Sequence, residues 1–61
     1  ALEDLLPGQE GTAISTLRPF GNAEVQGKIY EVRTNGEYIQ SGTRIKIIRI
    51  ISNQIFVEPL N

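Results

Sequence analysis

The chain of 61 residues contains no cysteine and no histidine. The lack of cysteine excludes disulfides and thiolate metal ligands. The lack of histidine excludes Ser–His–Asp and Cys–His catalysis, imidazole ligation of a metal and the usual pH switch near neutrality. A domain of this length buries only about 60% of the surface that its unfolded chain exposes, which leaves no room for a deep substrate cavity. We therefore expect no enzyme activity, no catalytic or metal site and no cofactor.

The chain also lacks a basic surplus and a long apolar run. Six Lys and Arg residues face seven Asp and Glu residues, for a formal net charge of −1. Nucleic-acid-binding domains usually carry a clear positive excess, so we expect no nucleic-acid partner. No apolar run approaches the roughly 18 residues that cross a bilayer, and the N-terminus does not resemble a signal peptide. Any membrane-spanning part of the protein is therefore expected outside this segment.

The chain begins at Ala1 rather than at methionine. Residues 1–6 resemble the end of a linker or a short entry segment, and Pro7-Gly8 breaks whatever precedes them. We therefore expect an excised domain in which residues 1–8 are a linker or entry segment and residues 9–61 fold.

What the sequence does contain is short β-favouring segments separated by glycine and asparagine. The alternation of apolar and polar residues between these breaks predicts half-buried strands, with no confident helix. Ser52-Asn53 is predicted to be a two-residue hairpin turn. In the fourth segment the alternation holds only as far as Ile47, which either a bulge or a change to full burial would explain. The predicted strands are residues 12–17, 23–26, 28–34, 43–51 and 54–58.

Five short strands with glycines at the corners indicate a closed barrel, because closure removes the exposed edges of a flat sheet. OB-fold and SH3-like barrels are the two candidates, and we favour the OB-fold. Residues 35–42 provide only eight residues between the third and fourth strands, enough for a turn. The prediction is an all-β, small five-stranded OB-fold-like β-barrel without a helix between strands 3 and 4. The expected interior residues are Ile14, Val25, Ile29, Val32, Ile45, Ile47, Ile55 and Val57.

The stretch Leu17-Arg18-Pro19-Phe20-Gly21 has two interpretations. As an OB loop that grips single strands, it would stack Phe20 on a base and place Arg18 on a phosphate. As a type I turn, it would use Pro19 at the second position and glycine at the end. The turn is the favoured interpretation.

Phe56 is the other aromatic residue that stands out. If Ile55 and Val57 face the core, the period of two turns Phe56 outward. Two outward phenylalanines, Phe20 and Phe56, can mark a protein contact surface. Phe56 could equally cover an end of the barrel or pack under the N-terminal segment. The candidate interaction residues are thus Arg18, Phe20 and Phe56.

The remaining cations alternate with acidic residues along the predicted strands. Opposite charges on facing strands are ordinary sheet stabilisation, worth roughly 0.2–1 kcal/mol a pair. We therefore interpret these cations as a solvated face: Lys28, Arg33, Arg44, Lys46 and Arg49.

From Gly11 onward, an ordered series of motifs resembles the C-terminal soluble domain of the nodulation formation efficiency D (NfeD) family. In this resemblance, Leu-Arg-Pro-x-Gly is a family hallmark at the first hairpin, so turn chemistry explains it without a ligand. In chain order the fragments are Gly11-Thr12-Ala13, Leu17-Arg18-Pro19-Phe20-Gly21, Val25-Gln26-Gly27-Lys28-Ile29-Tyr30, Tyr38-Ile39-Gln40-Ser41-Gly42-Thr43-Arg44-Ile45 and Ile55-Phe56-Val57-Glu58-Pro59.

The resemblance implies an OB-like barrel that follows membrane-spanning helices, on the cytoplasmic side as we expect. It also implies a stomatin-, prohibitin- or flotillin-like membrane protein as partner. The expected function is a non-catalytic interaction or regulatory domain that acts in membrane organisation or in regulating a membrane protease.

Two alternatives stay open. One is an OB domain that binds single-stranded nucleic acid through Arg18, Phe20, Lys28 and Tyr30. The other is a regulatory appendage to a protease on the same chain, since some family members carry a serine protease domain ahead of their membrane helices.

Overall fold

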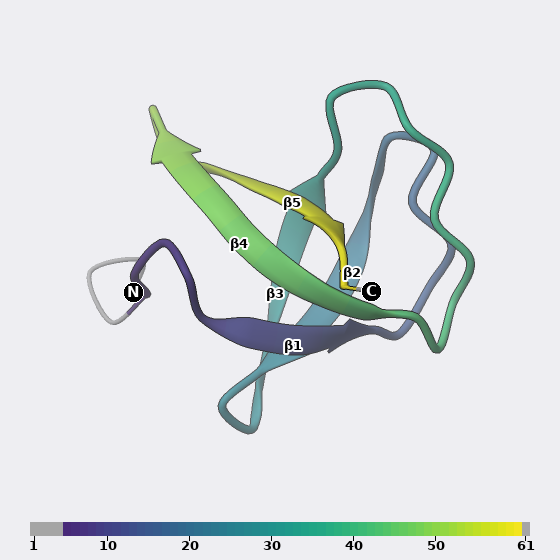
Figure 1. The fold of residues 1–61 in the computed structure, drawn as a ribbon, viewed down its shortest axis with the longest axis horizontal. Coiled ribbons are helices and arrows are strands. Elements are labelled where there is room, and N and C mark those ends of the chain that lie inside the picture. The colour runs from purple at the N-terminus through teal and green to yellow at the C-terminus, as the bar shows by residue number, and fades with distance from the viewer. Residues whose placement is uncertain (1–4, 61) are drawn as a thin grey trace.

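Five strands form a closed barrel in the computed structural model, which describes residues 5–60 (Figure 1). The hydrogen-bonded order is β1-β2-β3-β5-β4, and β4 closes the barrel against β1. All neighbours are antiparallel except β3 and β5, which are parallel. The predicted all-β barrel without a helix between its third and fourth strands is confirmed. The strands are β1 (Glu10–Ala13), β2 (Phe20–Val25), β3 (Lys28–Arg33), β4 (Arg44–Ile51) and β5 (Gln54–Pro59).

The first strand differs from the prediction by its position and by the face it buries. β1 ends at Ala13, and it is Gly11 and Ala13 that point into the barrel. Ile14 follows the strand and is 44% exposed, so its predicted interior position is wrong. The physical reason is the close approach of β1 and β2: a Cβ on Gly11 would meet the backbone carbonyl of Glu24. The small residues therefore face inward, and the larger isoleucine lies beyond them.

The predicted interior position of Ile29 is also wrong. Ile29 is 65% exposed, whereas Val32 is buried on the same strand. Residues an odd number of positions apart in a strand face opposite sides, so both cannot face the core. Tyr30 shares the face of Val32 and packs against the core instead. The other predicted interior residues are buried, and they are joined by Leu5, Ala13, Leu17, Ala23 and Ile39.

Two tight hairpins and one bulge set the register. The predicted Ser52-Asn53 turn is confirmed, with positive φ angles of 51° and 66° at its two residues, as a type I′ turn requires. Gln26 and Gly27 form a second such turn, with φ of 55° and 79°, which ends β2 one residue earlier than expected. Of the two explanations for the break in alternation after Ile47, the structure shows the bulge, as a register shift between Ile47 and Arg49. It leaves Ile48 unpaired and places Arg49 opposite Phe56 on β5.

The structure describes only the second half of the predicted entry segment, residues 1–8. Residues 1–4 lie outside the described residues. Leu5 belongs to the core, and the Gly8 N–H donates to the Ile47 carbonyl at 2.7 Å. Across the part of the chain that the structure describes, no helix is both long enough and apolar enough to cross a membrane.

Thr34 is a fully buried polar residue just after β3. Its hydroxyl donates to the Glu37 carbonyl at 2.6 Å and accepts the Gly36 N–H at 3.2 Å. We expect Thr34→Val to lower the free energy of unfolding by about 2 kcal/mol, because it leaves a carbonyl and an N–H without their partner. Urea unfolding followed by circular dichroism measures this. Thr34→Ser keeps the hydroxyl and should cost about 1 kcal/mol or less; equal losses in the two variants would contradict the role of the hydroxyl.

Candidate functional site

The stretch from Leu17 to Gly21 leads from β1 into β2 and is not a simple hairpin turn. Leu17 is fully buried and forms an isolated bridge with Ile39, through N–H···O bonds of 2.8 and 3.2 Å. The Pro19 carbonyl accepts the Thr34 N–H at 3.0 Å, and the Arg18–Pro19 peptide is cis. The structure therefore has a bend, tied to two other segments, in place of the predicted type I turn.

The glycine of this stretch is required by packing. A Cβ on Gly21 would meet the Leu17 side chain, the Thr16 carbonyl at 2.8 Å and the Ser15 hydroxyl at 2.9 Å. The same hydroxyl accepts the Asn22 N–H at 2.9 Å, which holds the bend over β2. Leu17 and Gly21 thus have structural roles, which leaves Arg18 and Phe20 as the side chains free to make contacts.

Phe20 belongs to a row of four side chains that crosses the outer surface of four strands. The sequence predicts a loop position for Phe20, but it is the first residue of β2. It pairs with Arg33 on β3. Arg33 pairs with Phe56 on β5, and Phe56 pairs with Arg49 on β4. We call Phe20, Arg33, Phe56 and Arg49 the aromatic–arginine row.

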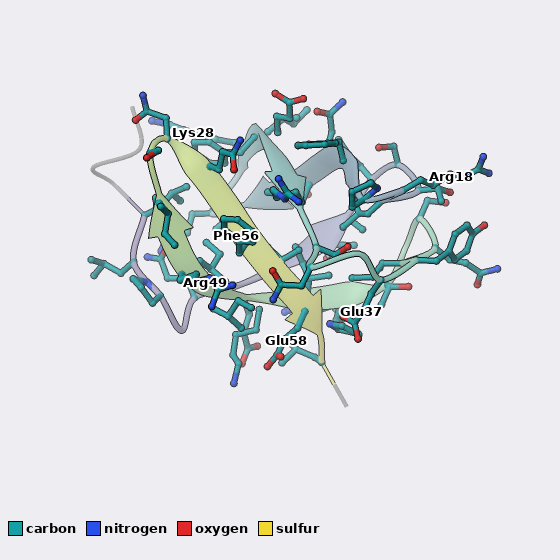
Figure 2. The ribbon with its side chains drawn as sticks, turned by 90° about the horizontal axis from the view of Figure 1, so that it is seen from above. Arg18, Lys28, Glu37, Arg49, Phe56 and Glu58 are labelled. Atoms are coloured by element: carbon teal, nitrogen blue, oxygen red, sulfur yellow. The ribbon has the colours of Figure 1, made fainter. Side chains whose placement is uncertain are left out.

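The side chains of the row stack on one another. The guanidinium carbon of Arg33 lies 4.7 Å from the centre of the Phe20 ring and 4.9 Å from that of Phe56. The guanidinium carbon of Arg49 lies 4.9 Å from the Phe56 ring centre. Figure 2 shows Phe56 on β5 with Arg49 beside it. Each contact of this kind is worth about 0.5–1 kcal/mol at an exposed site, so the row is an ordered surface.

The two arginines are held by neutral partners. Arg33 donates from Nε to the Thr34 carbonyl at 3.3 Å and from one terminal nitrogen to Gln54 Oε1 at 3.5 Å. Arg49 donates to Asn35 Oδ1 at 3.2 Å. Within residues 5–60 the one salt bridge is elsewhere, between Arg44 and Glu10 at 3.6 Å. Neither charge of the row is thus neutralised by a carboxylate of the described chain.

A small hollow lies beside Arg33, at the seam between β3 and β5. These two strands pair at a single position, whereas β2 and β3 pair at six. The cavity volume is about 70 Å³, well below the roughly 300–1,000 Å³ of sites for small molecules and cofactors. Since one water needs only about 10–15 Å³ by this measure, the hollow has room for a small group of atoms. Residues 5–60 contain no group of three acidic residues that could hold a metal ion. The lining residues are Phe20, Glu31, Val32, Arg33, Asn53, Gln54 and Ile55.

The predicted contact residues are only partly brought together. Phe20 is 49% exposed and Phe56 is half-buried, and Arg33 lies between their rings. Phe56 therefore faces outward and contacts the two arginines. Arg18 lies apart, with its guanidinium carbon 5.6 Å from the Tyr38 ring centre, at the far end of the barrel from Arg49 (Figure 2).

Sequence analysis missed Arg33 and Arg49 as site residues and assigned them to a solvated face. The signal that identifies them is the pairing of β3 with β5 and of β5 with the bulged end of β4. This pairing comes from barrel closure and cannot be read from local alternation.

Comparison with known proteins gives one family and one similar structure. The family model for the NfeD-like C-terminal, partner-binding domain matches residues 3–59. Among solved structures, the chain is similar to the C-terminal domain of stomatin operon partner protein 1510-C from Pyrococcus horikoshii, with a TM-score of 0.83 and 24% identity over 97% of this chain and 92% of that one. At that identity the likeness shows the fold alone. No curated protein matches the chain.

Proposed function

The chain belongs to the NfeD family, whose C-terminal, partner-binding domain it matches, and we propose that it is a non-catalytic module that binds a partner protein through the aromatic–arginine row. The observation that carries this proposal is the row itself, in which Phe20, Arg33, Phe56 and Arg49 are stacked neighbours on four adjoining strands. None of these four side chains is buried in the barrel, so all of them are available for contact with another protein.

The chemistry of the row fits a protein interface. Aromatic residues and arginine are enriched at interfaces, and arginine is among the residues that dominate binding energy. The row stands on the strands of a closed barrel, and each of its residues is paired with a neighbouring residue of the row. Binding to a surface that is already ordered costs less conformational entropy than binding to mobile loops.

As partner we propose a stomatin-, prohibitin- or flotillin-like membrane protein. The support is that the similar solved structure belongs to a protein named as a stomatin operon partner. In this proposal residues 1–8 link the barrel, residues 9–61, to a membrane-spanning part of the protein, and the barrel acts on the cytoplasmic side. The complex would serve membrane organisation or the regulation of a membrane protease.

Arg18 is proposed as a second, smaller contact, since it is exposed and stacks on Tyr38, which is 60% exposed. Because this pair lies outside the row, Arg18→Gln is expected to weaken partner binding less than changes to the row do.

The test compares variants of the full-length protein, purified from membranes of the source cell in mild detergent. We expect the combined Phe20→Ala and Phe56→Leu variant to reduce the recovery of the co-purifying partner protein at least tenfold. The reason is that truncating a central interface residue costs more than about 1 kcal/mol of binding free energy. Quantitative mass spectrometry measures the recovery. Leu6→Ala removes a 63% exposed apolar side chain outside the row and should change nothing. Unchanged recovery with the row variant, in a folded domain, would contradict the proposal.

Single-stranded nucleic acid is the second candidate ligand. Phe20 and Arg33 lie on β2 and β3, and the hollow reaches Asn53 in the β4–β5 turn. OB-folds bind oligonucleotides with this face and this loop. The net charge of −1 opposes the idea. A titration with a short oligonucleotide at low salt decides it: localised shifts on the row that weaken steeply with salt would favour nucleic acid over protein.

A further inference from the structure

The hollow beside Arg33 points to the chemistry of the partner. Resting on the proposed function, we propose that it binds one aspartate or glutamate side chain in an extended segment of the partner protein, and that apolar neighbours of this side chain cover the Phe20 and Phe56 rings. The sides of the hollow supply a cation, two amide side chains and an aromatic ring, from Arg33, Asn53, Gln54 and Phe20.

Arg33 is suited to hold a carboxylate. A guanidinium has five N–H donors in a planar fork, and two of those of Arg33 are used, on the Thr34 carbonyl and on Gln54 Oε1. The remaining donors can reach a carboxylate, and charge-assisted bonds of this kind are roughly twice as strong as neutral ones. The rings of Phe20 and Phe56 hold the guanidinium plane between them, which reduces the rotamer entropy lost on binding.

The seam supplies the backbone that an extended segment needs. β3 pairs with β2 along its whole length but with β5 only at Arg33. Between Lys28 and Val32, one side of β3 therefore has no strand in ladder with it. An unpaired strand edge accepts an added extended chain, whose main chain provides affinity while its side chains provide specificity. The partner segment would lie along this edge and place its acidic side chain in the hollow.

Glu31 limits what the hollow accepts. It is the one carboxylate among the lining residues, two positions before Arg33 on the same face of β3. A run of phosphates or of acidic residues would place negative charge against Glu31 as well as against Arg33. A single acidic side chain with apolar neighbours avoids this repulsion. This charge pattern favours a peptide with an isolated carboxylate over a single-stranded nucleic acid.

The test selects binders from a random peptide display library against the 61-residue chain and measures the synthesised peptides by fluorescence anisotropy. We expect the selected peptides to share one Asp or Glu beside apolar residues. Arg33→Gln should weaken their binding about tenfold or more, as the loss of a hydrogen bond to a charged group does. Glu31→Gln should strengthen peptide binding severalfold. Arg33→Lys keeps the charge but lacks the planar fork of donors, so its affinity for the peptide should lie between those of Arg33→Gln and the wild type.

Lys46→Gln is the matched control, because it removes the same charge from β4, outside both the row and the lining of the hollow. It should change the affinity less than twofold. Changing the peptide's acid to its amide should weaken binding as much as Arg33→Gln, with no further loss when both changes are combined. A well-dispersed NMR spectrum of each variant ensures that a loss of binding is not a loss of folding.

Several outcomes would overturn this inference. They are a library that yields no binders, peptides with a basic or uncharged consensus, and equal effects of Arg33→Gln and Lys46→Gln. If Phe20→Ala and Phe56→Leu weaken binding and Arg33→Gln does not, the row is a contact surface and only the acidic chemistry is wrong. If no row variant matters, the proposed surface fails too. If an oligonucleotide binds at the hollow and its affinity falls steeply with salt, the ligand of the hollow is a nucleic acid and not an acidic peptide.

Discussion

Replacing Leu17 with alanine is expected to lower the free energy of unfolding by about 2–5 kcal/mol. Leu17 is fully buried, and its bridge to Ile39 holds the bend that precedes β2 in the barrel. Domains of this size rarely have more than about 3–5 kcal/mol of stability, so the variant should be partly or wholly unfolded at room temperature. Circular dichroism in a urea titration measures the change.

The chain provides a matched control for this substitution. Leu6→Ala makes the same chemical change at a leucine that is 63% exposed, and it should alter stability by less than about 0.5 kcal/mol. If the two variants unfold at the same urea concentration, Leu17 is not the core residue that the structure describes, and the motif around it needs another explanation.

The second large effect is expected for Gly11→Ala, which should cost about 2–3 kcal/mol. The new Cβ would meet the carbonyl oxygen of Glu24 and, at 2.8 Å, Cγ2 of Val25. The first of these is a backbone atom in a paired strand, so the clash is relieved only if β1 and β2 move apart. Thermal unfolding in a calorimeter measures the loss.

Gly27→Asn tests whether the effect of Gly11→Ala is specific to its site. Gly27 has a φ of 79° in the β2–β3 turn, and a Cβ there would meet nothing within 4 Å. Asparagine tolerates such a conformation, so the change should cost less than about 1 kcal/mol. A Gly11→Ala variant as stable as the wild type would show that the two strands are further apart than described.

The fold class could be predicted because its signals are local. The Ser52-Asn53 turn and the break in alternation after Ile47 each depend on a few neighbouring residues. The turn has the predicted form, and the break is the bulge rather than the change to full burial. The errors at Ile14 and Ile29 have a different origin. The apolar character of a residue does not show which face its strand buries, and the small residue Ala13 and the amphipathic Tyr30 pack into or against the core instead.

The candidate site was less accessible to sequence analysis. Phe20 and Phe56 could be selected as aromatic residues that local patterns leave exposed. Arg33 and Arg49 could not be linked to them, because the link is the parallel pairing of β3 with β5 and the shift in register after the bulge of β4. Arg18 is close to Phe20 in sequence, but in the structure the bend after Leu17 places it over Tyr38 and away from the row.

The proposed function requires a partner protein to bind the aromatic–arginine row. The most direct test is to add the partner protein that co-purifies with the full-length protein to the isotope-labelled 61-residue chain. NMR spectra then show which amide signals shift or broaden. We expect the affected amides to cluster at Phe20, Arg33, Arg49 and Phe56, on β2, β3, β4 and β5. Changes confined to β1, the one strand that the row does not cross, or to the segment around Arg18 and Tyr38, would contradict it.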